Sequence, residues 1–270
     1  MEQKTNISTA DLEEIFADRR DVQFWKKEGP KHSYLFWVRA MLSKDPLLIE
    51  RVQIPCTAPD MPIRERGNLY AMLAKCFDVP TQELIKNLTD GSFSRAMESL
   101  ESQDCINNSG VREGKKLILN TGCPDNEEAL NVLKKEYTNL FFDSYMPFIP
   151  PYESIYRGEK HVMGKYSLVV ESFYRKIGLG VEAGSDMPDH ISHECEFVSI
   201  LCEKEADALK ECEKEKYRVM RKEFLCNHLL VWAQVFCSDL SLLAKSDFYR
   251  GISLIGKEFF DLECGVVCPE

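Results

Sequence analysis

Apolar residues recur with a helical period along most of the chain. Beyond residue 60, the segments "RERGNLYAMLAKCF", "TQELIKNL" and "SFSRAMESL" carry apolar residues every three or four positions, which predicts short helices. The same pattern predicts longer helices over residues 163–177, 187–212, 215–237 and 239–262. No stretch alternates polar and apolar residues convincingly enough to predict a strand. The periodicity therefore predicts an all-α fold, a single helical bundle of nine or ten helices.

Proline, glycine and asparagine divide this pattern into segments. Three prolines within "QIPCTAPDMP" predict a linker near residue 60. We therefore interpret residues 1–60 as an N-terminal helical extension and residues 61–270 as the main helical domain. "CINNSGVREGKKLILNTGCP" is predicted to be a loop, with a short strand or packed turn at "KLIL" as the alternative. Asp125 followed by Glu128 is a capping-box pattern, and predicts a helix through "EEALNVLKKEYTNLFFDSY".

Charge and composition narrow the classes of partner. The chain has 44 acidic and 34 basic side chains and a formal net charge of −10, which argues against a nucleic-acid or anionic membrane partner and favours a basic or neutral one. No apolar run approaches the roughly 18 residues of a membrane span, and the first residues lack the pattern of a secretory signal. We therefore expect a cytoplasmic protein. Eleven irregularly spaced cysteines do not suggest a disulfide framework, so most should be reduced and buried.

The stretch "MPDHISHECEFVSIL", residues 187–201, concentrates polar chemistry at the start of a predicted helix. On a helical wheel Glu194 falls inside the apolar stripe, and His190 lies on its edge one turn earlier, within reach of an i,i+4 hydrogen bond. Asp189 and His193 point the opposite way. Because a buried carboxylate is costly without a partner, Glu194 requires His190, a residue of another helix or a ligand.

Three interpretations of this stretch remain open. His190, His193 and Glu194 could hold a metal, although their order is not the His-Glu-x-x-His of zinc hydrolases. Pro188 and a nearby aspartate could simply begin a helix. The third interpretation, a polar cluster at the rim of a binding groove, agrees with the charge, because residues 182–215 contain eleven Asp and Glu against three Lys.

Two further motifs bear on binding. "PPYESIYR", residues 150–157, joins a stiff extended dipeptide to Tyr152 and Tyr156, which suits a binding surface and a structural loop equally well. "FLCNHLLVWAQVF" places His228 and Trp232 one turn apart on an apolar helix, where we expect core packing. No nucleophile–base constellation and no phosphate-binding glycine loop is recognisable, so the residues favour binding over catalysis.

Taken in order, these motifs resemble a known family. "PPYESIYRG", "MPDHISHECEFVSIL" and "FLCNHLLVWAQVF", preceded by "RERGNLYAMLAKCFDVPTQELIKNLTDGSF", make residues 62–262 similar to the TorD/DmsD/NarJ family of molybdoenzyme maturation chaperones. The resemblance implies a non-enzymatic, cytoplasmic, all-helical chaperone without a cofactor, a monomer or homodimer. Its partner would be the N-terminal twin-arginine signal peptide of a molybdopterin-containing oxidoreductase. The peptide-binding residues implied are Tyr152, Glu153, Ser154, Tyr156, Asp189, His190 and Glu194.

Two alternatives and one departure accompany this resemblance. A NarJ-like assembly factor would recognise a client that is not exported, and a metal-dependent hydrolase would use His190, His193 and Glu194. Residues 1–60 precede the family's usual start and could cover the groove or bind another subunit. They include Arg19-Arg20 in "DRRDVQFWKK", which is not an export signal because no apolar segment follows it.

Overall fold

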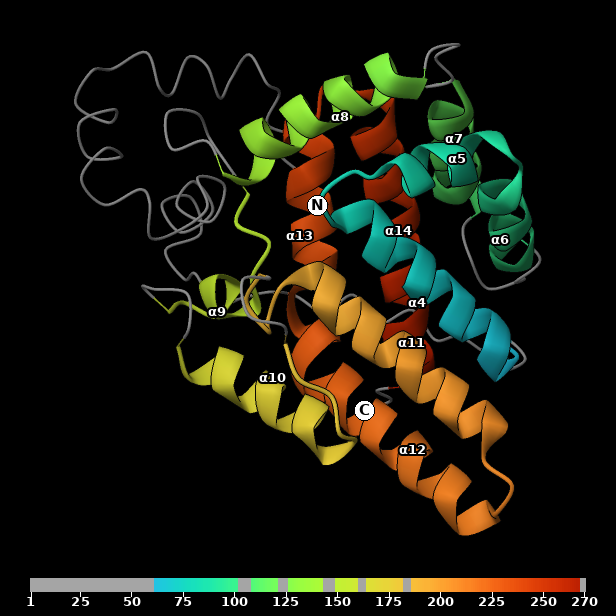
Figure 1. Cartoon of the computed structure of the whole chain (residues 1–270), viewed down its shortest axis with the longest axis vertical. Helices are drawn as coiled ribbons and strands as arrows, with labels where there is room; N and C mark the ends of the chain where they lie inside the picture. Colours follow the sequence, from blue (N-terminus) through green and yellow to red (C-terminus); the bar gives the residue numbers. More distant parts are fainter. Residues whose placement is uncertain are drawn as a thin grey trace, which may run out of the picture.

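The computed structural model describes residues 61–101, 108–120, 126–142, 149–159, 164–181 and 186–267. Within these ranges every regular element is a helix, which confirms the all-α prediction (Figure 1). The predicted N-terminal extension and Asp125 of the capping box lie outside the described residues. None of the described helices is both long enough and apolar enough to cross a membrane.

The helices of the described residues range from 4 residues in α9 to 21 residues in α14. The helices are α4 (Ile63–Phe77), α5 (Gln82–Thr89), α6 (Ser92–Glu101), α7 (Asn108–Asn120), α8 (Asn126–Phe141), α9 (Glu153–Tyr156), α10 (Lys165–Lys176), α11 (Ile191–Asp207), α12 (Glu211–Phe224), a π-helical turn η2 (Leu225–Leu229), α13 (Leu230–Leu243) and α14 (Asp247–Val267).

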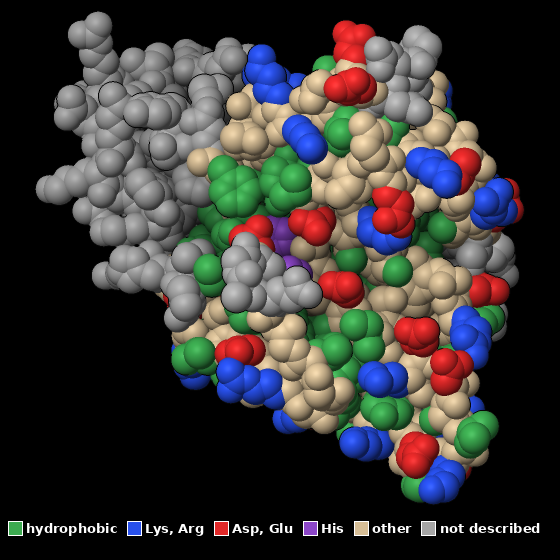
Figure 2. Space-filling view, in the orientation of Figure 1, with side chains coloured by type: hydrophobic (Ala, Val, Ile, Leu, Met, Phe, Trp, Pro, Cys, Tyr) green, Lys and Arg blue, Asp and Glu red, His purple; other side chains and the backbone are tan. Residues whose placement is uncertain are grey.

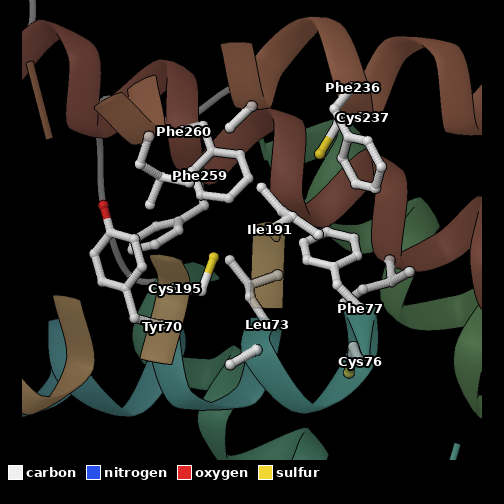
Figure 3. Close-up of a cluster of buried hydrophobic side chains, with 14 of the residues drawn as sticks. Tyr70, Leu73, Cys76, Phe77, Ile191, Cys195, Phe236, Cys237, Phe259 and Phe260 are labelled. Carbon is white, nitrogen blue, oxygen red and sulfur yellow. The ribbon is translucent and has the colours of Figure 1, made fainter. Parts of the chain in front are cut away.

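The core lies where α4 and α11 pack side by side against α13 and α14 (Figure 1). Phe77 of α4 meets Phe236 of α13 edge to face, with ring centroids 5.3 Å apart. Tyr70 packs on Phe259 of α14 at 4.8 Å. Figure 3 shows these rings closing around Ile191 and the Cys195 thiol of α11. The first turn of α11 is therefore packed into the core, where Ile191 and Cys195 are fully buried.

Residues 108–120, which were predicted as a loop with a possible strand or packed turn at "KLIL", form helix α7 instead, and close packing explains the difference. A Cβ atom on Gly114 would lie 2.5 Å from the carbonyl oxygen of Gly251 in α14, and one on Gly251 would lie 2.6 Å from the carbonyl oxygen of Gly114. The two helices approach so closely that both crossing positions must be glycine. The glycines that suggested a loop therefore serve a helix crossing.

Several predicted helix boundaries also change. The helix predicted over 187–212 begins at Ile191 and ends at Asp207. The break predicted near residue 238 is wrong, because α12, η2 and α13 follow one another without interruption and the chain leaves the helix only at Ala244, which has extended backbone angles. The end of the helix predicted over 163–177 is confirmed to within one residue: α10 stops at Lys176, and Gly178 adopts a φ of 79°.

Candidate functional site

Two of the three motifs meet through their backbones. Tyr152 and His190 form an isolated antiparallel bridge. Beside it the Glu153 amide donates to the Asp189 carbonyl at 3.0 Å, and the Ile191 amide donates to the Pro151 carbonyl at 2.9 Å. The two prolines hold the start of the first motif in an extended conformation. This extended stretch therefore runs alongside the residues just before α11. This pairing brings the predicted site residues of both motifs together.

Asp189 is fully buried, contrary to the prediction that it points away from the apolar stripe. Its Oδ2 accepts a hydrogen bond from the Ser154 amide at 3.0 Å. The helical wheel failed here because α11 begins only at Ile191, so Asp189 lies in the extended lead and its side chain does not follow the helical period. Asp189 ties the two motifs together and does not cap the helix.

His190 is the N-cap of α11 and is also fully buried. Its Nδ1 accepts from the Ser192 amide at 3.2 Å and lies 2.6 Å from the Ser192 hydroxyl, so the predicted i,i+4 bond to Glu194 is not formed. Its Nε2 lies 4.0 Å from Asp186, whose carboxylate also accepts from the Tyr152 hydroxyl at 2.7 Å. Burial lowers the pKa of His190 to about 3, which keeps the imidazole neutral at physiological pH.

Glu194 finds the partner it requires on another helix, one of the possibilities left open by the sequence. Its Oε2 accepts from the Trp232 indole N–H of α13 at 3.2 Å. Burial, followed by the charges of Glu153 and Asp189, raises the pKa of Glu194 well above its usual range, and a hydrogen bond with Glu153 raises it further. Burial thus favours the protonated form of Glu194, which can donate to Glu153.

Glu153 accepts hydrogen bonds from two elements at once. Arg157 Nη1 lies 3.1 Å from its Oε1, and His228 Nδ1 lies 3.0 Å from its Oε2. Arg157 also donates to the Asn227 carbonyl at 2.8 Å and stacks over the Tyr166 ring at 4.2 Å. His228 belongs to the π-helical turn, a geometry often found at functional sites. The sequence predicted neither residue as a partner of the site.

The two tyrosines of the first motif are mostly buried. Tyr156 is 7% exposed, its ring lies 5.2 Å from Trp232, and its hydroxyl donates to Asp239 at 3.3 Å. Tyr152 is 8% exposed and meets the His190 ring edge to face at 5.4 Å. These contacts anchor the loop against α13 and the start of α11. Trp232 is buried as predicted, and in addition it hydrogen-bonds the site.

Four buried polar atoms of the site have no hydrogen-bond partner among the described residues. They are Ser154 Oγ, Asp189 Oδ1, His190 Nε2 and Glu194 Oε1. In folded proteins nearly all buried polar groups are hydrogen-bonded, and each exception costs about 1–3 kcal/mol. Figure 2 shows histidine side chains among acidic and apolar ones on this side of the molecule. Such a concentration of unused polar atoms is typical of a binding site.

The predicted metal-ligand set does not assemble. His190 uses Nδ1 on Ser192, the His193 ring nitrogen Nδ1 lies 2.8 Å from the Met187 carbonyl, and Glu194 bonds the Trp232 indole. In the part of the chain that the structure describes, no group of three or more His, Cys, Asp or Glu side chains could hold a metal ion. Six cysteines there carry free thiols, and four of them are buried.

Comparisons with known proteins match the region that contains all three motifs. The family model of the nitrate reductase delta subunit matches residues 108–238. A perchlorate reductase assembly chaperone of Dechloromonas aromatica is 26% identical over 134 residues, which is 47% of this chain and 59% of the relative. The Tat proofreading chaperone DmsD of Haemophilus influenzae is 26% identical over 125 residues, 46% of this chain and 56% of the relative.

The chain thus aligns with less than two thirds of the length of either relative. A solved structure of a redox enzyme maturation protein from Archaeoglobus fulgidus is 26% identical and covers 63% of this chain and 99% of its own, with a TM-score of 0.35. From the family model and the two chaperone relatives, residues 108–238 of this chain are similar to the TorD/DmsD/NarJ family of molybdoenzyme maturation chaperones.

Proposed function

We propose that this protein is a chaperone that binds the N-terminal, twin-arginine signal peptide of a molybdopterin-containing oxidoreductase. In this role it retains the apoenzyme until the cofactor has been inserted. The family match over residues 108–238 supports a role in maturation, and the matched relatives are themselves an assembly chaperone and a Tat proofreading chaperone. The acidic balance of residues 182–215 suits a client segment that carries positive charge.

One observation carries the proposal: two motifs far apart in the sequence pair their backbones and bring Asp189, Glu194 and Glu153 together. Asp189 Oδ1 and Glu194 Oε1 are buried and without a donor among the described residues. A guanidinium group presents several N–H donors in a planar fork that fits carboxylate oxygens. A client arginine would use these two oxygens and would favour the ionised form of Glu194.

Arg157 is a guanidinium group already bound next to these carboxyl groups. It donates hydrogen bonds to a carboxylate oxygen of Glu153 and to a backbone carbonyl, and it lies over the face of a tyrosine ring. Each of these contacts suits a delocalised planar cation and fits an ammonium group less well. We infer that a second arginine, supplied by the client, binds beside Arg157 on Asp189 and Glu194.

The test is calorimetric titration of the full chain with a synthetic peptide carrying two adjacent arginines followed by an apolar segment. Asp189→Asn/Glu194→Gln preserves shape but removes the charges. Charge-assisted hydrogen bonds contribute about 1.5–3 kcal/mol each, so the variant should bind at least about ten-fold more weakly.

Glu196→Gln/Glu203→Gln is the matched control, because both residues are exposed on the same helix. The control should bind like the wild type. No binding by the wild-type chain, or an equal loss in both variants, would refute the proposal. Equally tight binding of a peptide without arginines would instead support a NarJ-like client that is not exported.

A further inference from the structure

The guanidinium group of Arg157 occupies a subsite that three elements build together. Glu153 of α9 contributes a carboxylate oxygen 3.1 Å from Arg157 Nη1, and the π-helical turn contributes the carbonyl of Asn227 at 2.8 Å. The ring of Tyr166 in α10 faces the guanidinium carbon at 4.2 Å. A carboxylate, a second acceptor and a flat aromatic face together match a planar, delocalised cation. The subsite therefore suits a guanidinium group, whichever residue supplies it.

This subsite reaches the surface of the molecule. The Arg157 side chain is 25% exposed, whereas the carboxylate of Glu153 that it contacts is fully buried. Helices α9 and α10 are neighbours at the edge of the molecule (Figure 1). Arg157 ends α9, and a Cβ atom built on the following Gly158 would have no neighbour within 4 Å. The arginine side chain therefore has solvent on one side, into which it can turn.

Other contacts hold the subsite together when the Arg157 side chain leaves it. His228 Nδ1 lies 3.0 Å from Glu153 Oε2 and so links the same two elements, α9 and the π-helical turn. The Glu153 amide in addition donates to the Asp189 carbonyl at 3.0 Å. Neither bond involves Arg157. A guanidinium group supplied by another chain would find the same carboxylate, carbonyl and ring.

We propose that Arg157 is a placeholder, which an arginine of the client displaces and whose three contacts that arginine takes over. The inference rests on the proposed function: one arginine of the client pair binds on Asp189 and Glu194, and the other enters the Arg157 subsite. Exchange of one guanidinium group for another keeps the number of contacts, so the remaining contacts of the client decide the outcome. Because Arg157 competes from within the same molecule, it lowers the apparent affinity for the client in proportion to its occupancy of the subsite.

The first measurement needs no client, because Arg157→Ala empties the subsite. Methylguanidinium at about 50 mM should then raise the Tm of this variant by about 2–4 °C, since a cation that binds only the folded state stabilises it. Methylammonium, which is not planar, should not do so. Arg175→Ala is the matched control and should not respond, because Arg175 pairs with Glu171 at the same i,i+4 spacing but with a 70% exposed side chain.

Three results of this first measurement would overturn the inference. One is that methylguanidinium does not stabilise Arg157→Ala. Another is that it stabilises the wild type and Arg175→Ala equally, or that methylammonium acts as strongly. The third is that Arg157→Ala does not fold, because a placeholder must be able to leave its subsite.

The second measurement titrates the twin-arginine peptide and separates the two proposals. Without the placeholder, Arg157→Ala should bind the peptide about three- to ten-fold more tightly than the wild type. Lys165→Ala removes a positive charge 5.8 Å from the same Tyr166 ring without opening the subsite, so it should change the affinity by less than about two-fold.

Unchanged or weaker binding by Arg157→Ala, or equal tightening in both variants, would refute the placeholder, and the client function would stand as long as the wild type binds. If methylguanidinium stabilises Arg157→Ala but none of the proteins binds the peptide, the client function fails and only the guanidinium subsite stands.

Discussion

For the single residue Glu194, burial of the carboxyl group means that it needs a hydrogen-bond partner inside the protein. The helical wheel correctly placed Glu194 among apolar side chains and indicated that it needs a partner. It could not identify Trp232, which lies 38 positions away on another helix. Nor could it place Asp189, because the wheel applies only where the helix has begun. Residue-level periodicity predicts burial well, but the partner of a buried group is set by tertiary structure.

The raised pKa of Glu194 predicts a pH-dependent effect on stability. Burial raises the pKa of its carboxyl group well above the unfolded-chain value, which lies near pH 4.3. The stability it contributes is therefore complete below that pH and is lost as the pH rises towards the folded-state pKa. Glutamine keeps the shape and cannot ionise, so Glu194→Gln should gain stability relative to the wild type by about 1 kcal/mol or more between pH 5 and pH 8.

Urea denaturation at pH 5 and pH 8 checks this prediction. The exposed Glu196→Gln variant, on the same helix, should follow the wild type at both pH values. The account of Glu194 would be wrong if Glu194→Gln lost stability relative to the wild type as the pH rose. Such a result would mean that the buried carboxyl group is ionised and paired in the folded protein.

Helices α7 and α12–α13 show where sequence patterns fail at the scale of the element. Asparagine and glycine ordinarily indicate a loop, but in α7 the glycines lie at a helix crossing. In α12–α13 the π-helical turn lies inside the helix predicted over 215–237, and the break predicted near residue 238 occurs only at Ala244. The deviation in α7 depends on a neighbouring helix, α14, which a sequence pattern does not reveal.

The crossing of α7 and α14 gives a stability prediction. In Gly114→Ala the new methyl group meets the Gly251 carbonyl at 2.5 Å, and one helix must shift. Overpacking of this kind typically costs about 1–3 kcal/mol, whereas replacing glycine by alanine in a helix gains about 1 kcal/mol in helix propensity. At the upper end of that range the cost exceeds the gain, so the substitution destabilises the protein. Gly180→Ala is the control, because no atom lies within 4 Å of the added carbon. Thermal unfolding should show a lower Tm for Gly114→Ala only; equal Tm values would argue against a tight crossing.

For the whole molecule, the sequence predicts the fold class but not how the motifs meet. Apolar periodicity was sufficient to predict an all-helical fold, because a bundle buries one face of each helix. The three motifs singled out in the sequence also contact one another in the structure. Their mutual geometry was not predictable, since the antiparallel pairing of Tyr152 with His190 is a contact between distant segments. The roles of Arg157 and His228 emerge only from that geometry.

We propose that Asp189 and Glu194 recognise client arginines, and a double-mutant cycle separates this role from a purely structural one. Wild-type protein and Asp189→Asn/Glu194→Gln are each titrated with the twin-arginine peptide and with the same peptide carrying two glutamines. The substitutions should weaken binding of the arginine peptide by about ten-fold or more and of the glutamine peptide hardly at all, because the altered carboxyls then have no cation to lose. Equal weakening of both peptides would contradict it and would mean that the cluster only holds the start of α11 in place.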